Sequence, residues 1–134
     1  MVMRVVCGIL IWNDKILIGK RKPDNPNFPD KWELPGGKVE PGETDYDAIV
    51  REFKEELDID VQAVHELKNI SDDEIQFIPW VLRLVGGKAK LNEHSEIKFV
   101  SEKEFFEMDL TKYSREVGKT FFRSYTIFLR KENS

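Results

Sequence analysis

Cysteine, long apolar runs and excess positive charge are all scarce in this sequence. The one cysteine, Cys7, cannot form a disulfide within the chain, which agrees with a reducing compartment. No apolar run approaches the roughly 18–20 residues needed to cross a bilayer. The apolar start at 2–12 lacks the charged region and cleavage site of a secretory signal. We therefore expect a cytoplasmic protein without a membrane partner, in which Cys7 is a buried strand residue.

The balance of charge is acidic. The chain has 21 Lys and Arg against 25 Asp and Glu, which gives a net charge of −4. A nucleic-acid polymer needs a basic face on its partner, so this balance argues against such a polymer. It leaves open a small nucleotide whose charge a metal ion neutralises.

Length and composition predict a single domain that covers residues 1–134. The sequence is 40% hydrophobic and 34% charged, and its apolar segments recur along the whole chain. A domain of this size buries roughly two thirds of its unfolded surface, which is enough for one core. We find no repeat, linker or low-complexity stretch.

Local patterns predict strands and helices in irregular alternation. A hairpin is expected from strands at 2–12 and 15–21, because the pair Asn13–Asp14 favours a turn. The remaining expected elements are a loop at 22–30, a short strand at 31–37 stopped by Pro35 and the glycines, a helix at 45–57, strands at 58–70, 74–87 and 96–101, a short helical piece at 102–108 and a helix at about 113–129. Pro79 should break its strand or place it at an edge. This mixture predicts an α/β domain of the α+β kind, with a mixed β-sheet sandwiched between helices.

The segment 36–57, GGKVEPGETDYDAIVREFKEEL, places many acids beside glycines. At about 100° per residue, Glu52, Glu55 and Glu56 fall on one side of the expected helix. Like charges at these spacings repel, each pair by a few tenths of a kcal/mol. The expected buried face consists of Tyr46, Ile49, Val50, Phe53 and Leu57. Thr44, followed by Asp47, resembles the cap that begins a helix.

Two interpretations of this acidic side remain open. It is either a solvated acidic face or a site for a divalent cation, which takes carboxylate oxygens, waters and phosphates as ligands. A solvated face usually alternates lysine with glutamate at i,i+4, and this segment does not. Gly36, Gly37 and Gly42 would let backbone with positive φ approach a ligand closely.

The same segment resembles the Nudix hydrolase family, whose motif is G-x5-E-x7-R-E-U-x-E-E-x-G-U, with U a bulky aliphatic residue. The matching positions here are Gly37, Glu43, Arg51, Glu52, Phe53, Glu55, Glu56 and Ile59. Phe53 is aromatic rather than aliphatic, and Asp58 stands where the family has glycine. Asp can adopt the left-handed conformation that ends a helix, so the departure concerns loop shape more than chemistry. The stretch KWELPGGKVEPGE is also similar to the MutT-like branch, and the similarity covers most of the chain.

The resemblance implies the Nudix fold and a metal-dependent pyrophosphohydrolase. The substrate would be a nucleoside triphosphate, normal or oxidised, such as CTP, dCTP or 8-oxo-dGTP. The products would be a nucleoside monophosphate and pyrophosphate, and the cofactor Mg²⁺ or Mn²⁺. Alternatives are a Nudix hydrolase of another nucleoside diphosphate derivative, such as a dinucleoside polyphosphate or a nucleotide sugar, and a non-catalytic nucleotide-binding module. The protein would be a monomer or a homodimer.

The resemblance also implies roles for residues of the motif. The catalytic set is Glu43, Arg51, Glu52 and Glu55. Glu52, Glu55 and Glu56 would be metal ligands, together with the backbone carbonyl of Gly36. Glu52 is the candidate base, and Arg51 should orient Glu52 or pair with Glu43.

Residues outside the motif are weaker candidates. Glu96 is either a further metal ligand or an ordinary acid at the end of a strand, with Glu93 as the weaker alternative. Arg21 and Lys38 would contact phosphates. Trp32 and Phe77, like Phe28 and Trp80, would either stack on a nucleobase or belong to the core. The two histidines, His65 and His94, are expected at the surface or in loops rather than in catalysis.

Overall fold

The computed structural model describes residues 2–132, and the side chains of residues 2–125. The strands are β1 (Met3–Trp12), β2 (Lys15–Arg21), β3 (Trp32–Glu33), β4 (Gly36–Lys38), β5 (Ile59–Glu66), β6 (Ile70–Ser71), β7 (Ile75–Gly87) and β8 (His94–Val100). The helices are α1 (Asp45–Leu57), α2 (Glu102–Glu107) and α3 (Lys112–Glu132). None of the helices in this described part combines the length and apolar character needed to span a membrane.

The strands form one mixed sheet. Its main path runs β3-β2-β1-β7-β5, with β4 paired to β1, β6 to β7 and β8 to β2. β1 and β7 are parallel, and the other paired strands are antiparallel. Mixed pairing of this kind confirms the predicted sheet.

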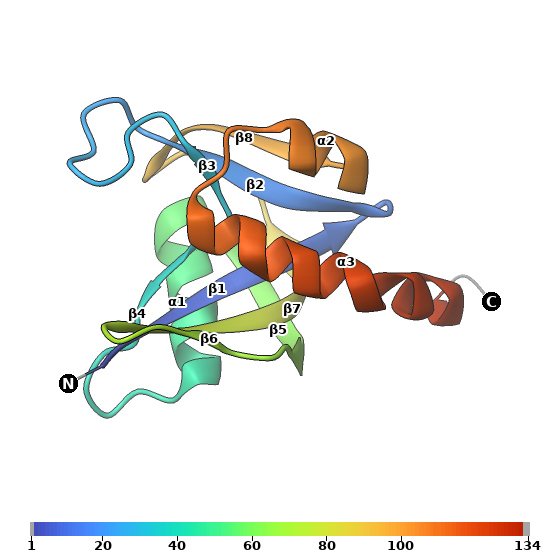
Figure 1. Cartoon of the computed structure of the whole chain (residues 1–134), viewed down its shortest axis with the longest axis horizontal. Helices are drawn as coiled ribbons and strands as arrows, with labels where there is room; N and C mark the ends of the chain where they lie inside the picture. The colour runs from blue at the N-terminus through green and yellow to red at the C-terminus, as the bar shows by residue number, and fades with distance from the viewer. Residues whose placement is uncertain (1, 133–134) are drawn as a thin grey trace.

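Helices cover both faces of the sheet (Figure 1). Along β1, Cys7 and Ile9 point into a cluster with α2 and α3, whereas Val6 and Leu10 point into a cluster with α1. This alternation follows from the two-residue period of a strand. The expected sandwich of sheet and helices is therefore confirmed, and Cys7 is buried as predicted.

The predicted hairpin is present. Asn13 and Asp14 both have positive φ, 51° and 60°, as the tight turn of a two-residue hairpin requires. The segment 22–30 contains no helix or strand, as its prolines predict.

Helix α1 begins and ends where the sequence predicts. Thr44 accepts a hydrogen bond from the backbone N–H of Asp47, and Asp58 ends the helix in the left-handed conformation, with φ 57° and ψ 33°. The prediction was wrong for Tyr46, which is 42% exposed. Its ring packs against Trp80 of β7 in a T-shaped arrangement and does not enter the core.

Three strand predictions need correction. The segment 58–70 forms two strands, β5 and β6, rather than one. Pro79 neither breaks β7 nor places it at an edge. Its carbonyl accepts a hydrogen bond from the backbone N–H of Leu67, which lies between β5 and β6. The nitrogen of Pro79 faces the same side, where the pairing of β7 with β5 and β6 is interrupted, so no strand hydrogen bond is lost there. The short strand β3 ends before Pro35 as predicted, but the glycines after Pro35 begin a further strand, β4.

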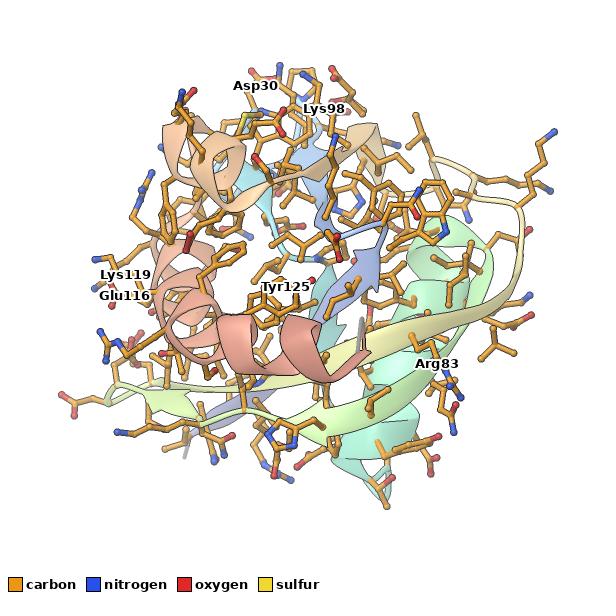
Figure 2. All side chains as sticks on the ribbon, turned by 90° about the vertical axis from the view of Figure 1, so that its right-hand side faces the viewer. Asp30, Arg83, Lys98, Glu116, Lys119 and Tyr125 are labelled. Carbon is orange, nitrogen blue, oxygen red and sulfur yellow. The ribbon has the colours of Figure 1, made fainter. Side chains whose placement is uncertain are left out.

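The last third of the chain is largely as predicted. β8 and α2 occupy the expected segments, and Ser101 and Glu104 form a reciprocal cap at the start of α2. Helix α3 continues past the predicted end at 129. Its buried residues Val117, Phe121 and Tyr125 recur every four positions, a helical period that outweighs the β-prone composition around them. Figure 2 labels Tyr125, which belongs to the core between α3 and the sheet.

Candidate active site

The acidic side of α1 lies at the border of the core. The side chain of Glu52 is 13% exposed and that of Glu55 is 58% exposed. Glu56 is only 9% exposed, which is unusual for a charged residue. The three carboxylates therefore lie at different depths: Glu56 is the deepest, Glu52 is next, and Glu55 is well solvated.

Arg51 ties these acids to the loop before the helix. Its Nε and Nη2 donate to the two oxygens of Glu43 at 2.6 and 2.9 Å. Its Nη1 donates to Glu52 at 3.0 Å and to Glu55 at 3.1 Å. Its Nη2 also donates to the carbonyl of Lys38 at 3.0 Å. The pairing expected for Arg51 is confirmed, and this one guanidinium group fixes the orientation of Glu52.

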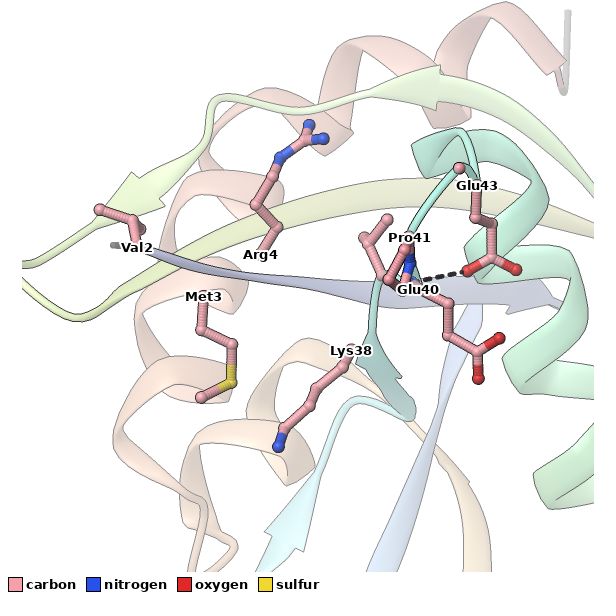
Figure 3. Close-up of a pocket in the computed structure, with 9 residues that line it drawn as sticks. Val2, Met3, Arg4, Lys38, Glu40, Pro41 and Glu43 are labelled. Carbon is pink, nitrogen blue, oxygen red and sulfur yellow. Dashed lines mark hydrogen bonds between the residues drawn. The ribbon is translucent and has the colours of Figure 1, made fainter.

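Glu43 stabilises the turn that leads into α1. Besides Arg51, it accepts the backbone N–H of Glu40 at 3.0 Å (Figure 3). The hydrogen bond with Arg51 is the main reason that the pKa of Glu43 falls to about 2, and the bond from Glu40 lowers it further. The same bond raises the pKa of Arg51 above its ordinary value. Both groups therefore stay charged throughout the physiological range.

The glycines of β4 allow two close approaches. A Cβ on Gly36 would lie 1.9 Å from the carbonyl oxygen of Val6 on β1, and a Cβ on Gly37 would lie 2.5 Å from the carboxylate of Glu52. Neither glycine has positive φ, in contrast to the expectation, whereas Gly42 does, at 80°. The glycine pair thus serves close packing, with Gly37 leaving room for Glu52.

Glu56 is the most buried acid of the site. Burial raises the pKa of Glu56 well above its ordinary value, and the nearby carboxylates of Glu33, Glu52 and Glu93 raise it further. A hydrogen bond from the backbone of Gly36 acts in the opposite direction. One carboxylate oxygen of Glu56, Oε2, is buried and has no hydrogen-bond partner. Such an oxygen is costly unless a ligand satisfies it.

The pKa of Glu52 is raised as well. Burial is the largest cause, and Arg51 partly offsets it. A carboxylate with a raised pKa accepts a proton more readily near neutral pH than an ordinary one does.

The donor atoms of the site fit a divalent cation. Among residues 2–125, no three or more His, Cys, Asp or Glu side chains already stand close enough to hold a metal ion. Arg51 holds an oxygen of Glu52 and an oxygen of Glu55, while Oε2 of Glu56 lacks a partner. A divalent cation would satisfy that oxygen and offset the repulsion between the acids. Carboxylate and carbonyl oxygens are the ligands that Mg²⁺ and Mn²⁺ take.

Glu33 belongs to the site, although the sequence did not single it out. It accepts from Nη1 of Arg21 at 2.6 Å and pairs with Nε2 of His94 at 2.9 Å. His94 is 2% exposed, so the prediction of a surface or loop histidine was wrong: it lies in β8 against Gly19. Arg21 makes a further bond to the carbonyl of Asn27 at 2.7 Å. In the sequence, Glu33 is an acid between two apolar residues, Trp32 and Leu34, a pattern that could have marked it as partly buried.

The acids before and within β8 lie in different places. Glu93 is close enough to raise the pKa of Glu56. Glu96 instead pairs with Lys98 at 3.5 Å. Its neighbours Ile97 and Phe99 pack toward the α1 side of the sheet, so strand alternation directs Glu96 to the other side. The structure thus brings Glu93, and not Glu96, toward the carboxylates of α1.

The aromatic residues that were predicted to stack on a nucleobase lie in different surroundings. Trp32 is 7% exposed within the core, and Nζ of Lys98 lies over its ring at 5.3 Å. Phe77 lines a pocket of about 390 Å³. The other residues that line this pocket are Met3, Val5, Arg21, Asn27, Phe28, Glu33, Lys38, Ile75, Thr111 and Tyr113. The pocket therefore joins both predicted phosphate contacts, Arg21 and Lys38, to an aromatic wall. Lys38 also lines a second pocket beside Glu40 and Glu43, drawn in Figure 3, where its side chain points away from Glu43.

Comparisons with known proteins show which family and relatives the chain is similar to. The NUDIX domain model matches residues 2–121. A protein of Mycobacterium tuberculosis (strain H37Rv) named "Putative 8-oxo-dGTP diphosphatase 2" is 32% identical over 111 residues, which cover 78% of this chain and 77% of that protein. The CTP pyrophosphohydrolase of Escherichia coli K12 is 32% identical over 113 residues, which cover 81% of this chain and 82% of that protein.

A solved structure of a MutT protein has a similar fold. The MutT protein of Methanosarcina mazei superposes with a TM-score of 0.76 at 27% identity, and the match covers 92% of this chain and 95% of that one.

Proposed function

Since the chain belongs to the Nudix family and is a hydrolase with MutT-like relatives, we propose that it cleaves nucleoside triphosphates to nucleoside monophosphates and pyrophosphate. The observation that carries the proposal is the row of glutamates on α1, one of them buried with an unpartnered oxygen, beside the glycines of β4. The names of the relatives favour CTP and 8-oxo-dGTP as the first substrates to test.

The family generally uses divalent metal ions, and we assign Mg²⁺ or Mn²⁺ to the α1 carboxylates. Glu52, Glu55 and Glu56 would hold it, with the carbonyl of Gly36. Glu93, which lies nearer to Glu56 than Glu96 does, would replace Glu96 in the ligand set. The bound ion would screen the negative charge of the phosphates and favour ionisation of the attacking water.

The protein groups supply the proton transfer. Water attacks one of the two phosphorus atoms that flank the α,β-bridge, the bridging P–O bond breaks, and the leaving phosphate group takes the electron pair of that bond. The carboxylate of Glu52, which Arg51 orients, takes the proton that the water loses. Glu43 holds Arg51 in place and does not touch the substrate.

Substrate binding would use the pocket beside the acids. Arg21 and Lys38 provide the positive charge for phosphate oxygens, and Phe77 provides an aromatic surface for the base. The buried ring of Trp32 leaves it a supporting role beneath Lys98 rather than a contact with the base. Glu33 would hold the Arg21 side chain in position through their ion pair.

The test is a substrate panel assayed with Mg²⁺, in which pyrophosphate and inorganic phosphate are measured separately. The panel contains the normal ribo- and deoxyribonucleoside triphosphates, 8-oxo-dGTP, a dinucleoside polyphosphate and a nucleotide sugar. We expect pyrophosphate from at least one triphosphate and no activity without the metal. Release of inorganic phosphate alone, or hydrolysis of the nucleotide sugar alone, would replace the proposal with one of the alternatives.

A further inference from the structure

A pair of aromatic rings forms one wall of the 390 Å³ pocket. Phe77 of β7 and Tyr113 of α3 are stacked, with ring centroids 4.2 Å apart and an angle of 21° between the ring planes. Both residues are only partly buried, unlike the core aromatics Phe105 and Phe121, which are 0% and 1% exposed. The pair therefore keeps aromatic surface open to the pocket.

A single acidic residue holds the outer ring in place. The hydroxyl of Tyr113 donates to Oδ2 of Asp72 at 2.6 Å. The other oxygen, Oδ1, accepts the backbone N–H groups of Glu74 and Ile75, both at 2.8 Å. Asp72 is thus fixed to the turn that begins β7, the same strand that carries Phe77. Hydrogen bonds from Tyr113 and from these two backbone groups lower the pKa of Asp72 to about 2, so it is ionised at neutral pH.

We propose that Asp72 and Tyr113 are positioning residues for the nucleobase. Their hydrogen bond holds the ring of Tyr113 against Phe77, and the two rings together present a preformed aromatic surface to the base. The inference rests on the proposed function and extends it from the phosphates to the base. An ordered ring costs less entropy on binding than a mobile one, so the pair acts on affinity for the base.

The position of this pair argues against a purely structural role. Asp72 is exposed, so its hydrogen bond with Tyr113 lies at the surface and not within the core. Tyr113 is the second residue of α3, so its hydroxyl pins the start of that helix beside the mouth of the pocket. A stacking surface made from two separate elements needs such a bond to keep one orientation.

The experiment measures binding of nucleoside 5′-monophosphates and of ribose 5-phosphate by isothermal titration calorimetry. Ribose 5-phosphate has the sugar and the phosphate but no base. The variants are Tyr113→Phe, Asp72→Asn and their double variant, and Tyr113→Leu removes the ring altogether. Tyr46→Phe is the matched control, because Tyr46 also contacts an aromatic ring but does not line the pocket.

We expect the wild-type protein to bind at least one nucleoside monophosphate more tightly than ribose 5-phosphate. Loss of one hydrogen bond should weaken nucleotide binding about two- to tenfold in Tyr113→Phe. Loss of the ring in Tyr113→Leu should weaken it about fivefold or more. Ribose 5-phosphate binding should stay unchanged in every variant. The double variant should bind the nucleotide no more weakly than whichever single variant, Tyr113→Phe or Asp72→Asn, binds it less tightly.

Two results would overturn the inference. One is a wild-type protein that binds no nucleoside monophosphate better than ribose 5-phosphate. The other is a Tyr113→Phe variant that leaves nucleotide binding unchanged or weakens both ligands equally, as a general loss of structure would. The assay needs no turnover, so a failure of the proposed hydrolysis would appear separately, as absence of pyrophosphate.

Discussion

At the scale of single residues, two glutamates one helical turn apart have different surroundings. Glu52 accepts a hydrogen bond from Arg51, whereas Glu56 is nearly buried and one of its oxygens has no partner. An oriented carboxylate suits proton transfer, and a buried unpaired one suits a cation. The account therefore assigns the base to Glu52 and the deepest metal contact to Glu56.

Glu52→Gln keeps the shape of the side chain and removes its basicity. We expect kcat to fall about 10²- to 10⁴-fold, the usual contribution of a general base, with a smaller change in KM. Steady-state kinetics at saturating Mg²⁺ measure both constants. A matched control is Glu107→Gln, which removes an exposed acid of α2 from a weak ion pair with Lys103. A near wild-type kcat in Glu52→Gln would assign the base to another residue.

Glu56→Gln should separate stability from metal binding. Because burial raises the pKa of Glu56, the ionised form is disfavoured in the folded protein, so removal of the charge should not lower the Tm without metal. The Mg²⁺ concentration needed for half-maximal activity should rise at least tenfold. Thermal denaturation in a chelator and a Mg²⁺ titration of activity measure the two effects. A large loss of Tm with an unchanged Mg²⁺ requirement would make Glu56 a structural residue.

Glu43 should make the stability of the protein depend on acid pH. Its pKa is about 2 in the folded protein against an ordinary value of 4.5. A carboxyl group with a lowered pKa stabilises the fold fully above the ordinary value, and this contribution is lost as pH falls from about 4.5 to about 2. The Tm difference between wild type and Glu43→Gln should therefore be largest near pH 6 and shrink toward pH 2.5. A Tm difference that does not vary with pH would mean that the charge of Glu43 does not contribute to stability through its ion pair with Arg51.

At the scale of elements, the site depends on how closely β4 approaches both β1 and α1. Gly36 packs against the backbone of β1, which cannot move without disturbing the sheet. Gly37 packs against the end of the Glu52 side chain, which can move. Gly36 is therefore needed for the packing of β4 against β1, and Gly37 for the position of the Glu52 carboxylate.

This difference predicts opposite outcomes for two alanine variants. Gly37→Ala should keep a near wild-type Tm but lose activity, since the methyl group displaces the Glu52 carboxylate. Gly36→Ala should lose Tm strongly, because its methyl group would overlap the carbonyl of Val6. Thermal denaturation and kcat, measured on both variants, provide the comparison. An active Gly37→Ala enzyme would show that the carboxylate of Glu52 does not need this position.

At the scale of the whole molecule, the sequence predicted the parts that depend on local patterns. Helix α1, its caps and the hairpin follow from residues adjacent in sequence, such as Thr44, Asp58 and the pair Asn13–Asp14. The position of the acids on one edge of α1 follows from the helical period. The family motif added the pairing of Arg51 with Glu43, which the structure contains.

The parts that the sequence did not predict depend on contacts between distant segments. His94 was expected at the surface because nothing near it in sequence indicates its partner, Glu33, which is 61 positions away. Pro79 was expected to interrupt its strand, but the gap between β5 and β6 is visible only in the assembled sheet. Tyr113 and Phe77 form a wall only because α3 packs beside β6 and β7.

The most direct test of the central claim is a crystal structure of the protein with Mn²⁺ and a non-hydrolysable nucleoside triphosphate analogue, with anomalous difference density recorded at the manganese edge. The account predicts a peak between the carboxylates of Glu52 and Glu56, next to β4, with the analogue's phosphates beside it. A manganese peak elsewhere in the molecule, with both carboxylates free of metal, would contradict the account.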